Sequence, residues 1–219
     1  DPYYDAGTNI YEGETIGNAV VSALPDFQAV RLYASMKDTN SSMTPLTSNI
    51  LREFNKGAGF LLLDGHGGPS WWNTCWPKHC NTTIPFGGLS VYDVFRLHND
   101  GMLPVTVIGG CHCCDFNVTM LSALLDPHNT HATWANGLPL SRCLGESLLM
   151  KKNGGSIAVL GCTGLGYEQA GENGDLDGDG RNLPDCAEAL NGYLELSFFQ
   201  AYQNGTRSLG ALWNQAITQ

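Results

Sequence analysis

The fold of this chain is decided by one stretch, Val105-Thr-Val-Ile-Gly-Gly-Cys111, in which a short apolar run ends in glycine and then presents a cysteine. A run of this length closed by glycine is typical of a buried parallel strand at its C-terminal end. A counterpart lies upstream in Phe60-Leu-Leu-Leu-Asp-Gly-His66-Gly67, which presents a histidine. Two such strands lying side by side would set Cys111 and His66 on the same rim of a sheet, where open α/β sheets place their chemistry.

Helical patterns alternate with these strands along the chain. The spacing of apolar residues predicts helices over 46–55, 90–99, 140–152, 187–203 and 208–218. It predicts strands over 58–63, 105–109, 154–161 and 28–34, a strand or short helix over 19–24, and loops over 1–18, 35–45, 64–87, 112–137 and 162–184. Strands and helices in alternation build a mostly parallel sheet that is covered on both faces, so we expect an α/β fold.

Composition and charge exclude several classes of protein. The chain has 219 residues, 42% of them hydrophobic, which is enough for a proper core in one large or two small domains. The net charge of −10 argues against nucleic acid or an anionic membrane as a partner, because both require a basic face. No apolar run approaches the ~20 residues that span a bilayer, so we expect no membrane span.

Cysteines and glycosylation sequons indicate an oxidising compartment. The chain contains eight cysteines, a high density for a cytosolic protein: Cys75, Cys80, Cys111, Cys113, Cys114, Cys143, Cys162 and Cys186. It also contains four N-x-[ST] acceptor sites, at Asn40, Asn81, Asn117 and Asn204. We therefore expect a secreted or cell-surface glycoprotein with disulfide bonds. Plausible pairs are Cys75–Cys80, Cys162–Cys186, and Cys143 with Cys113 or Cys114, although spacing does not determine connectivity.

The chemistry expected at the rim is nucleophilic catalysis by Cys111. Only a thiolate attacks, and a free cysteine has a pKa of ~8.5, so the thiol needs a base or a cation beside it. His66 on the adjacent strand end can provide one. The backbone N–H groups of Gly67 and Cys111 together would form an oxyanion hole. A buried cysteine taken alone is more often a core residue or half of a disulfide, and it is the pairing of two matching strand ends that favours acyl transfer through a thioacyl intermediate.

Several motifs resemble the catalytic half of the gingipain family of cysteine peptidases. They are Gly65-His66-Gly67-Gly68 after a strand, Gly110-Cys111 followed by Asp115-Phe116, Gly145-Glu-Ser-Leu148, the segment 152–161, and the segment 204–213. The resemblance implies a three-layer α/β/α caspase-like (caspase-hemoglobinase) fold with a mostly parallel sheet, formed by residues 1–219 as a single catalytic subdomain. The family's N-terminal half is not represented, so we expect that maturation removed it or that a second chain completes the sheet.

The resemblance also implies roles for individual residues. Cys111 matches the nucleophile, His66 the catalytic histidine, which acts chiefly on the leaving amine, and Gly67 the glycine of the oxyanion hole. The loop 162–168, with Tyr167 and Glu168, lies where the family builds a wall of its primary specificity pocket. Cys113, Cys114 and His112 crowd the nucleophile, but Cys111 is the residue that directly ends the strand.

Three tryptophans, Trp71, Trp72 and Trp76, follow His66. They line a substrate cleft or cap the core, and the sequence favours neither interpretation.

A calcium loop is the second functional motif. Asp175, Asp177 and Asp179 occupy positions 1, 3 and 5 of a calcium-loop pattern, with Gly180 at position 6. Arg181 would contribute its carbonyl, and the bidentate ligand must come from Asp185, Glu188 or Glu172 because position 12 is Cys186. We expect a structural Ca²⁺.

We therefore predict a secreted cysteine endopeptidase that acts on polypeptides. One alternative is a catalytically inactive, calcium-stabilised surface or scaffold module of the same fold, and the other is a transpeptidase.

Overall fold

The computed structural model describes residues 11–76, 79–83, 87–125, 140–171 and 174–218. These residues form two compact units, one made of the described residues between 32 and 166 and the other of residues 11–31 together with those between 167 and 218. The described part is mixed α/β with a parallel three-stranded sheet, which is compatible with a caspase-like fold. None of the helices in these ranges is long and apolar enough to cross a membrane.

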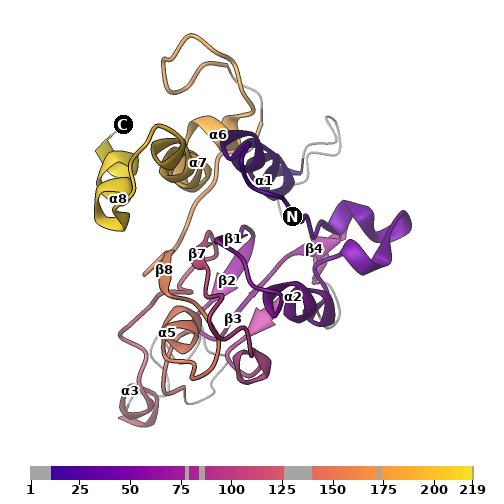
Figure 1. Ribbon diagram of the computed structural model, residues 1–219, viewed down its shortest axis with the longest axis vertical. Helices are drawn as coiled ribbons and strands as arrows, with labels where there is room; N and C mark the ends of the chain where they lie inside the picture. The colour runs from indigo at the N-terminus through magenta and orange to yellow at the C-terminus, as the bar shows by residue number, and fades with distance from the viewer. Residues whose placement is uncertain (1–10, 77–78, 84–86, 126–139, 172–173, 219) are drawn as a thin grey trace. The chain divides into compact units, whose positions relative to one another are not determined.

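The unit 32–166 is built on the predicted parallel sheet. Its strands are β1 (Phe60–Leu63), β7 (Val105–Ile108) and β8 (Ala158–Gly161), in the order β1-β7-β8 (Figure 1). Phe60 pairs with Val105 and Leu63 with Ile108, while Ile108 also pairs with Gly161. The two motif-bearing strands are therefore neighbours in register, as the sequence predicts, and the third expected strand lies beside them.

Two helices and one face of the sheet share a core. Helix α2 (Thr47–Phe54) and helix α5 (Leu144–Leu149) both contribute to a buried apolar cluster that includes Leu63 and Ile108. Leu61 and Val159 also pack against this cluster. Side chains alternate between the two faces of a strand, so Leu61 lies on the same face of the sheet as Leu63. At the start of the sheet, the buried Asn99 side chain accepts a hydrogen bond from Gly155 N (2.9 Å) and donates to Gly155 O (3.0 Å), which fixes β8 against the chain entering β7.

The segment 64–87 differs from its prediction as a loop, because it contains short antiparallel strands. β2 (His66–Gly68), β3 (Trp71–Asn73) and β6 (Leu89–Ser90) form a three-stranded sheet in that order, and β4 (Cys75–Trp76) pairs with β5 (His79–Thr83). A two-residue turn, Pro69-Ser70, joins β2 to β3. Strands this short carry no readable alternation, and two of the three residues of β2 are glycines, which are depleted in strands.

Two further predictions are wrong. The segment 28–34 is not a strand, because Tyr33 N donates to Met43 O but no ladder continues from it. The segment 90–99 forms turns and a 3₁₀ helix, η3 (Val94–Arg96), instead of an α-helix. There the Asp93 carboxylate accepts hydrogen bonds from Ser90 N and Ser90 Oγ, and such local bonds compete with helical ones.

The remaining elements of this unit are short. They are η1 (Ala34–Asp38), η2 (Ser41–Met43) and α3 (Met120–Leu125). Helix α5 is shorter at both ends than the predicted 140–152.

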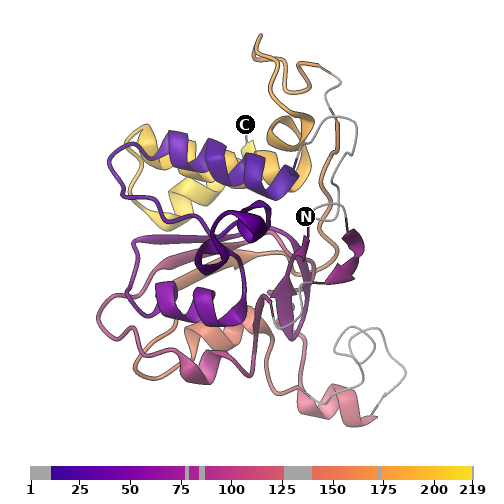
Figure 2. The ribbon, with the colours of Figure 1, turned by 90° about the vertical axis from the view of Figure 1, so that its right-hand side faces the viewer.

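The second unit is helical. It contains α1 (Glu12–Ala23), α6 (Asp185–Glu188), α7 (Leu190–Gln203) and α8 (Leu209–Thr218), and α7 packs against α1, α6 and α8 (Figures 1 and 2). The helical alternative for 19–24 is thus confirmed, whereas residues 12–18 are helix and not loop. The predicted helix over 187–203 is interrupted at Ala189, whose extended backbone (φ −144°, ψ 158°) separates α6 from α7. Phe198 and Phe199 of α7 are fully buried in this unit.

Candidate active site

The two strand ends that carry His66 and Cys111 are held together by close contact between glycines. The parallel ladder continues past the strands, since Gly109 N donates to Leu63 O at 2.9 Å. Beyond it, a Cβ built on Gly110 would lie 2.9 Å from Gly67 Cα and 3.0 Å from His66 O. A Cβ built on Gly67 would lie 2.7 Å from Cys111 O. Because real Cβ contacts are longer than these, only glycine lets the two backbones approach so closely.

Cys111 is half-buried, and its sulfur contacts the backbone N–H and carbonyl of one residue in the loop that follows β8. Gly166 N donates to Cys111 Sγ at 3.4 Å, and the thiol donates to Gly166 O at 3.5 Å. The next residue, His112, has φ 54°, a left-handed conformation that is uncommon outside glycine. Such backbone strain is concentrated at functional sites, where surrounding contacts maintain it. Here His112 N donates to Gly164 O, so the same loop holds the turn.

The neighbouring cysteines have a different environment from Cys111. Cys113 and Cys114 are 0% and 2% exposed. Burial raises the pKa of Cys113 well above its ordinary value and raises the pKa of Cys114 to about 12. Cys143 is also buried, and burial raises its pKa. These three thiols stay protonated at neutral pH, which leaves Cys111 as the accessible thiol at the end of β7.

Cys113 and Cys114 also explain why glycines surround the site. The Cys113 sulfur fills the space beside Gly67, at 2.5 Å from a built Cβ, and donates to Trp71 O. The Cys114 sulfur fills the space beside Gly145 and Gly161, at 2.6 and 2.9 Å from built Cβ atoms. Both cysteines therefore pack the core behind the strand ends.

The two histidines near the site also differ. His66 is half-buried, and burial lowers its pKa below the ordinary 6.5, so its imidazole is neutral at pH 7. His112 directs Nδ1 toward the buried Asp115 carboxylate, 3.5 Å from Oδ2. His112 therefore pairs within its own turn.

The other predicted substrate residues are spread over both units. Trp72 is buried in the core of the unit 32–166, while Trp71 and Trp76 are half-buried. Tyr167 is 62% exposed and Glu168 is half-buried, and both belong to the helical unit. Nothing in the sequence indicates that Gly166 contacts the Cys111 sulfur.

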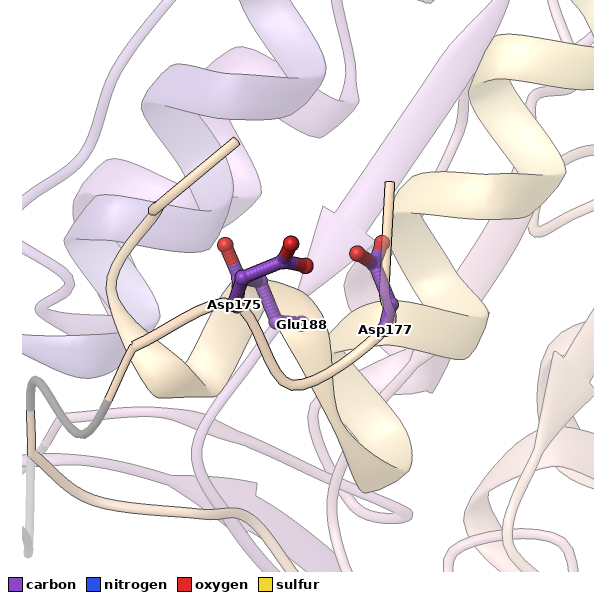
Figure 3. Close-up of side chains that lie close together, drawn as sticks. All are labelled: Asp175, Asp177 and Glu188. Carbon is purple, nitrogen blue, oxygen red and sulfur yellow. The ribbon is translucent and has the colours of Figure 1, made fainter. Parts of the chain in front are cut away.

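The acidic loop brings three carboxylates together in the helical unit. Ligand oxygens of Asp175, Asp177 and Glu188 all lie within 4.8 Å of one another, and Figure 3 shows the two aspartates on the loop with Glu188 on α6. Glu188, one of the three expected candidates for the bidentate ligand, is buried and accepts hydrogen bonds from Leu176 N and Leu183 N. Of the other expected ligands, Asp179 and Arg181 are exposed, Asp185 is fully buried at the start of α6, and Glu172 is outside the described residues.

None of the seven cysteines for which a thiol is described forms a disulfide. The predicted pairing of Cys143 with Cys113 or Cys114 and the predicted Cys162–Cys186 bond are absent from this part of the chain, and the side chain of Cys80 lies outside the described residues. Cys143 instead caps α5, where its sulfur accepts a hydrogen bond from Glu146 N at 3.5 Å. Cys111 is accordingly a free thiol.

A free, accessible cysteine and a neutral histidine at the ends of neighbouring parallel strands are features of a cysteine peptidase. The chain belongs to peptidase family C25, whose family model matches residues 2–219. The resemblance to the gingipain family is thereby confirmed, and a peptidase of this family acts on polypeptides. The chain matches no curated protein and no solved structure.

Proposed function

We propose that the chain is a secreted cysteine endopeptidase in which Cys111 is the nucleophile and His66 the proton-transfer partner. The observation that carries this proposal is the contact of the Gly67 and Gly110 backbones, which brings the two strand ends together at Cys111, the one thiol of the cluster Cys111, Cys113 and Cys114 that is not buried. Family membership gives the reaction class, and this geometry supports the residues.

The proposed reaction uses the neutral imidazole of His66 twice. It accepts the thiol proton as the Cys111 sulfur attacks the scissile carbonyl carbon. The resulting imidazolium then protonates the leaving nitrogen as the C–N bond breaks, which leaves a thioester on Cys111. Water attacks the thioester in the second half, with His66 taking its proton and returning it to the thiolate. The lowered pKa of His66 suits this role, since the base must be unprotonated at the start.

The negative charge on the carbonyl oxygen requires donors at the same place. We assign this role to the backbone N–H groups of Gly67 and Cys111, whose backbones are in contact. Donors of this kind contribute ~2.7–4 kcal/mol each to the transition state. Tyr167 and Glu168 are proposed to border the pocket for the residue before the scissile bond, by resemblance to the family.

The test is a comparison of two cysteine variants. We expect Cys111→Ala to abolish peptide cleavage and iodoacetamide to label Cys111 first in the native protein. Cys75→Ala removes a buried cysteine in β4 and should retain cleavage wherever the variant is folded. Cleavage by Cys111→Ala at the wild-type rate would refute the assignment, and adding an amine nucleophile would reveal a transpeptidase through an amide product.

A structural Ca²⁺ in the acidic loop forms a second part of the proposal. Asp175, Asp177 and Glu188 offer only oxygen atoms, the ligands that calcium prefers, and three carboxylates so close together repel one another unless a cation compensates them. We expect added Ca²⁺ to raise the melting temperature and a chelator to lower it. Asp175→Asn should remove most of this shift, whereas Asp179→Asn, which lies outside the group, should retain it. No shift in the wild type would refute the site.

The proposal also includes secretion of the protein and additional strands that extend the parallel sheet. Sequons support secretion, since Asn40, Asn117 and Asn204 are exposed, and the mass of the protein made in a glycosylating host would show how many are used.

Strands β1 and β8 are the two edges of the parallel sheet within the described residues. Further strands from an N-terminal segment or a second chain would pair there, and the apolar face carrying Phe60 and Leu62 needs the second helical layer of a caspase-like fold.

A further inference from the structure

We propose that a cavity beside His66 is a specificity pocket for a large apolar side chain on the leaving-group side of the scissile bond. This inference rests on the proposed peptidase function and adds a substrate preference to it. It is carried by the register of the antiparallel sheet β2-β3-β6 and by the residues that line the cavity.

The antiparallel sheet extends the surface around His66 away from the nucleophile. His66 pairs with Asn73, and Trp71 pairs with Ser90. Directly opposed residues point to the same face of an antiparallel pair, with Cβ atoms about 4.5–5.5 Å apart, and residues two apart on a strand share a face. His66, Asn73, Trp71 and Ser90 therefore form one continuous row on a single face.

A cavity of about 350 Å³ adjoins this row. Its lining includes Asn73 and Trp71 of β3, Leu89 and Ser90 of β6, and Asp93 and Arg96 of the turns that follow. Since Asn73 is the direct partner of His66, the cavity begins one residue pair away from the histidine. All of these residues belong to the unit 32–166 that carries Cys111.

The order of the strands determines which half of the substrate meets this cavity. β7, which is followed by Cys111 three residues after its end, lies between β8 and β1. The loop after β8 contacts the Cys111 sulfur through Gly166, and β1 leads into β2 with His66 on the other side. The leaving amine takes its proton from His66, so the leaving half of the peptide lies on the His66 side. The cavity is therefore in reach of one of the first two residues after the scissile bond.

The lining selects a large apolar side chain. Trp71, on the same face of the sheet as His66, provides an apolar wall, and an aromatic ring stacks favourably on an indole. The Asp93 carboxylate is already engaged, since it accepts from Ser90 N (3.0 Å) and Ser90 Oγ (2.6 Å) and lies 3.5 Å from Arg96 Nη1. Arg96 is 61% exposed and has spare N–H donors. A lysine or arginine of the substrate would thus meet a cation and no free carboxylate.

The test uses quenched fluorescent peptides that are identical up to the scissile bond and vary at the two following positions. Phe, Tyr or Leu at one of these positions should raise kcat/KM about tenfold over Ala, the factor that corresponds to burying one such side chain. Lys should fall below Ala. Equal kcat/KM for all peptides would overturn the specificity pocket while leaving the peptidase intact.

Variants of residues that line the cavity then test whether the substrate preference arises there. Trp71→Ala should lower the Phe/Ala ratio toward one, and Thr47→Phe, which fills the cavity from its α2 wall, should do the same. Tyr92→Ala removes an aromatic residue that is 58% exposed and does not line the cavity, so its ratio should equal that of the wild type. A wild-type ratio in both cavity variants would overturn the inference. Absence of all cleavage, or full cleavage by Cys111→Ala, would instead refute the proposed function and the inference with it.

Discussion

The glycine contact between the two strand ends gives a sharp prediction for Gly67→Ala. A Cβ at this position would lie 2.7 Å from Cys111 O and from Gly110 C, both backbone atoms, and 2.5 Å from Cys113 Sγ. Ordinary contact begins at 3.4 Å, so the backbone that carries the nucleophile must move by at least 0.7 Å. Misplacement of about 1 Å at a reacting group costs about 10²-fold in rate, so we expect kcat/KM to fall by tens to about a hundred-fold.

The same variant should also lose stability. Overpacking of a close-packed site costs about 1–3 kcal/mol, which urea unfolding at pH 7.5 would measure. Activity is to be measured at a urea concentration and temperature at which more than about nine-tenths of the variant is folded, so that misplacement and unfolding are separated.

A matched control is Gly210→Ala in α8. No heavy atom lies within 4 Å of its built Cβ, and alanine in a helix is favoured over glycine by about 0.5–1 kcal/mol. This variant should be slightly more stable and equally active. If Gly67→Ala matched the wild type in both stability and kcat/KM, the contact of the two strand ends would be refuted.

Three further predictions follow from the same structure. His66 binds a proton more weakly in the folded state than in the unfolded state, so its contribution to stability is present above the unfolded pKa of about 6.5 and decreases as the pH falls through the lower folded pKa; the acid limb of kcat/KM should likewise lie below pH 6.5, and a limb above it would contradict a buried histidine. Because burial raises the pKa of Cys114 to about 12, alkylation of the native protein at pH 8 should modify Cys111 at least 10-fold faster, a difference that denaturant should abolish; equal rates in the native protein would show that Cys114 is accessible. Asn99→Ala leaves the backbone groups of Gly155 without their buried partner, and we expect a loss of about 2–4 kcal/mol in urea unfolding, with a loss below about 0.5 kcal/mol arguing against the contact.

The sequence predicted the parallel strands because the pattern that marks them is local and strong. Val105–Ile108 and Phe60–Leu63 are apolar runs bounded by glycine, and they pair as expected. The sequence also predicted helix α2, because its apolar residues recur at helical spacing and Gly57 follows it. The sequence did not predict the short strands around Trp71, since two or three residues give no period to detect. The pairing of these strands also depends on contacts made elsewhere in the chain.

The two wrong elements have related causes. The apolar alternation over 28–34 is real, but a strand also requires a neighbour, and the described chain provides only the bond from Tyr33. The segment 90–99 has apolar residues at helical spacing, and Val91 and Val94 of the expected face are buried, but the bonds of Asp93 to Ser90 favour tight turns. Periodicity thus predicted neither the backbone of these two segments nor all of their buried side chains, since Val30 is 55% exposed and Phe95 is 79% exposed.

The motif Val105–Cys111 and its counterpart at His66 predicted by themselves the two neighbouring parallel strands, because an apolar run that ends in glycine is a local pattern in the sequence. Only the tertiary structure distinguishes the neighbouring cysteines by their burial, since burial and the resulting pKa shifts depend on atoms contributed by distant segments. Among the described residues, it likewise places the Glu188 carboxylate beside those of Asp175 and Asp177. The row from His66 to Ser90 also belongs to the tertiary structure, because a face of an antiparallel sheet exists only once the register of its strands is set.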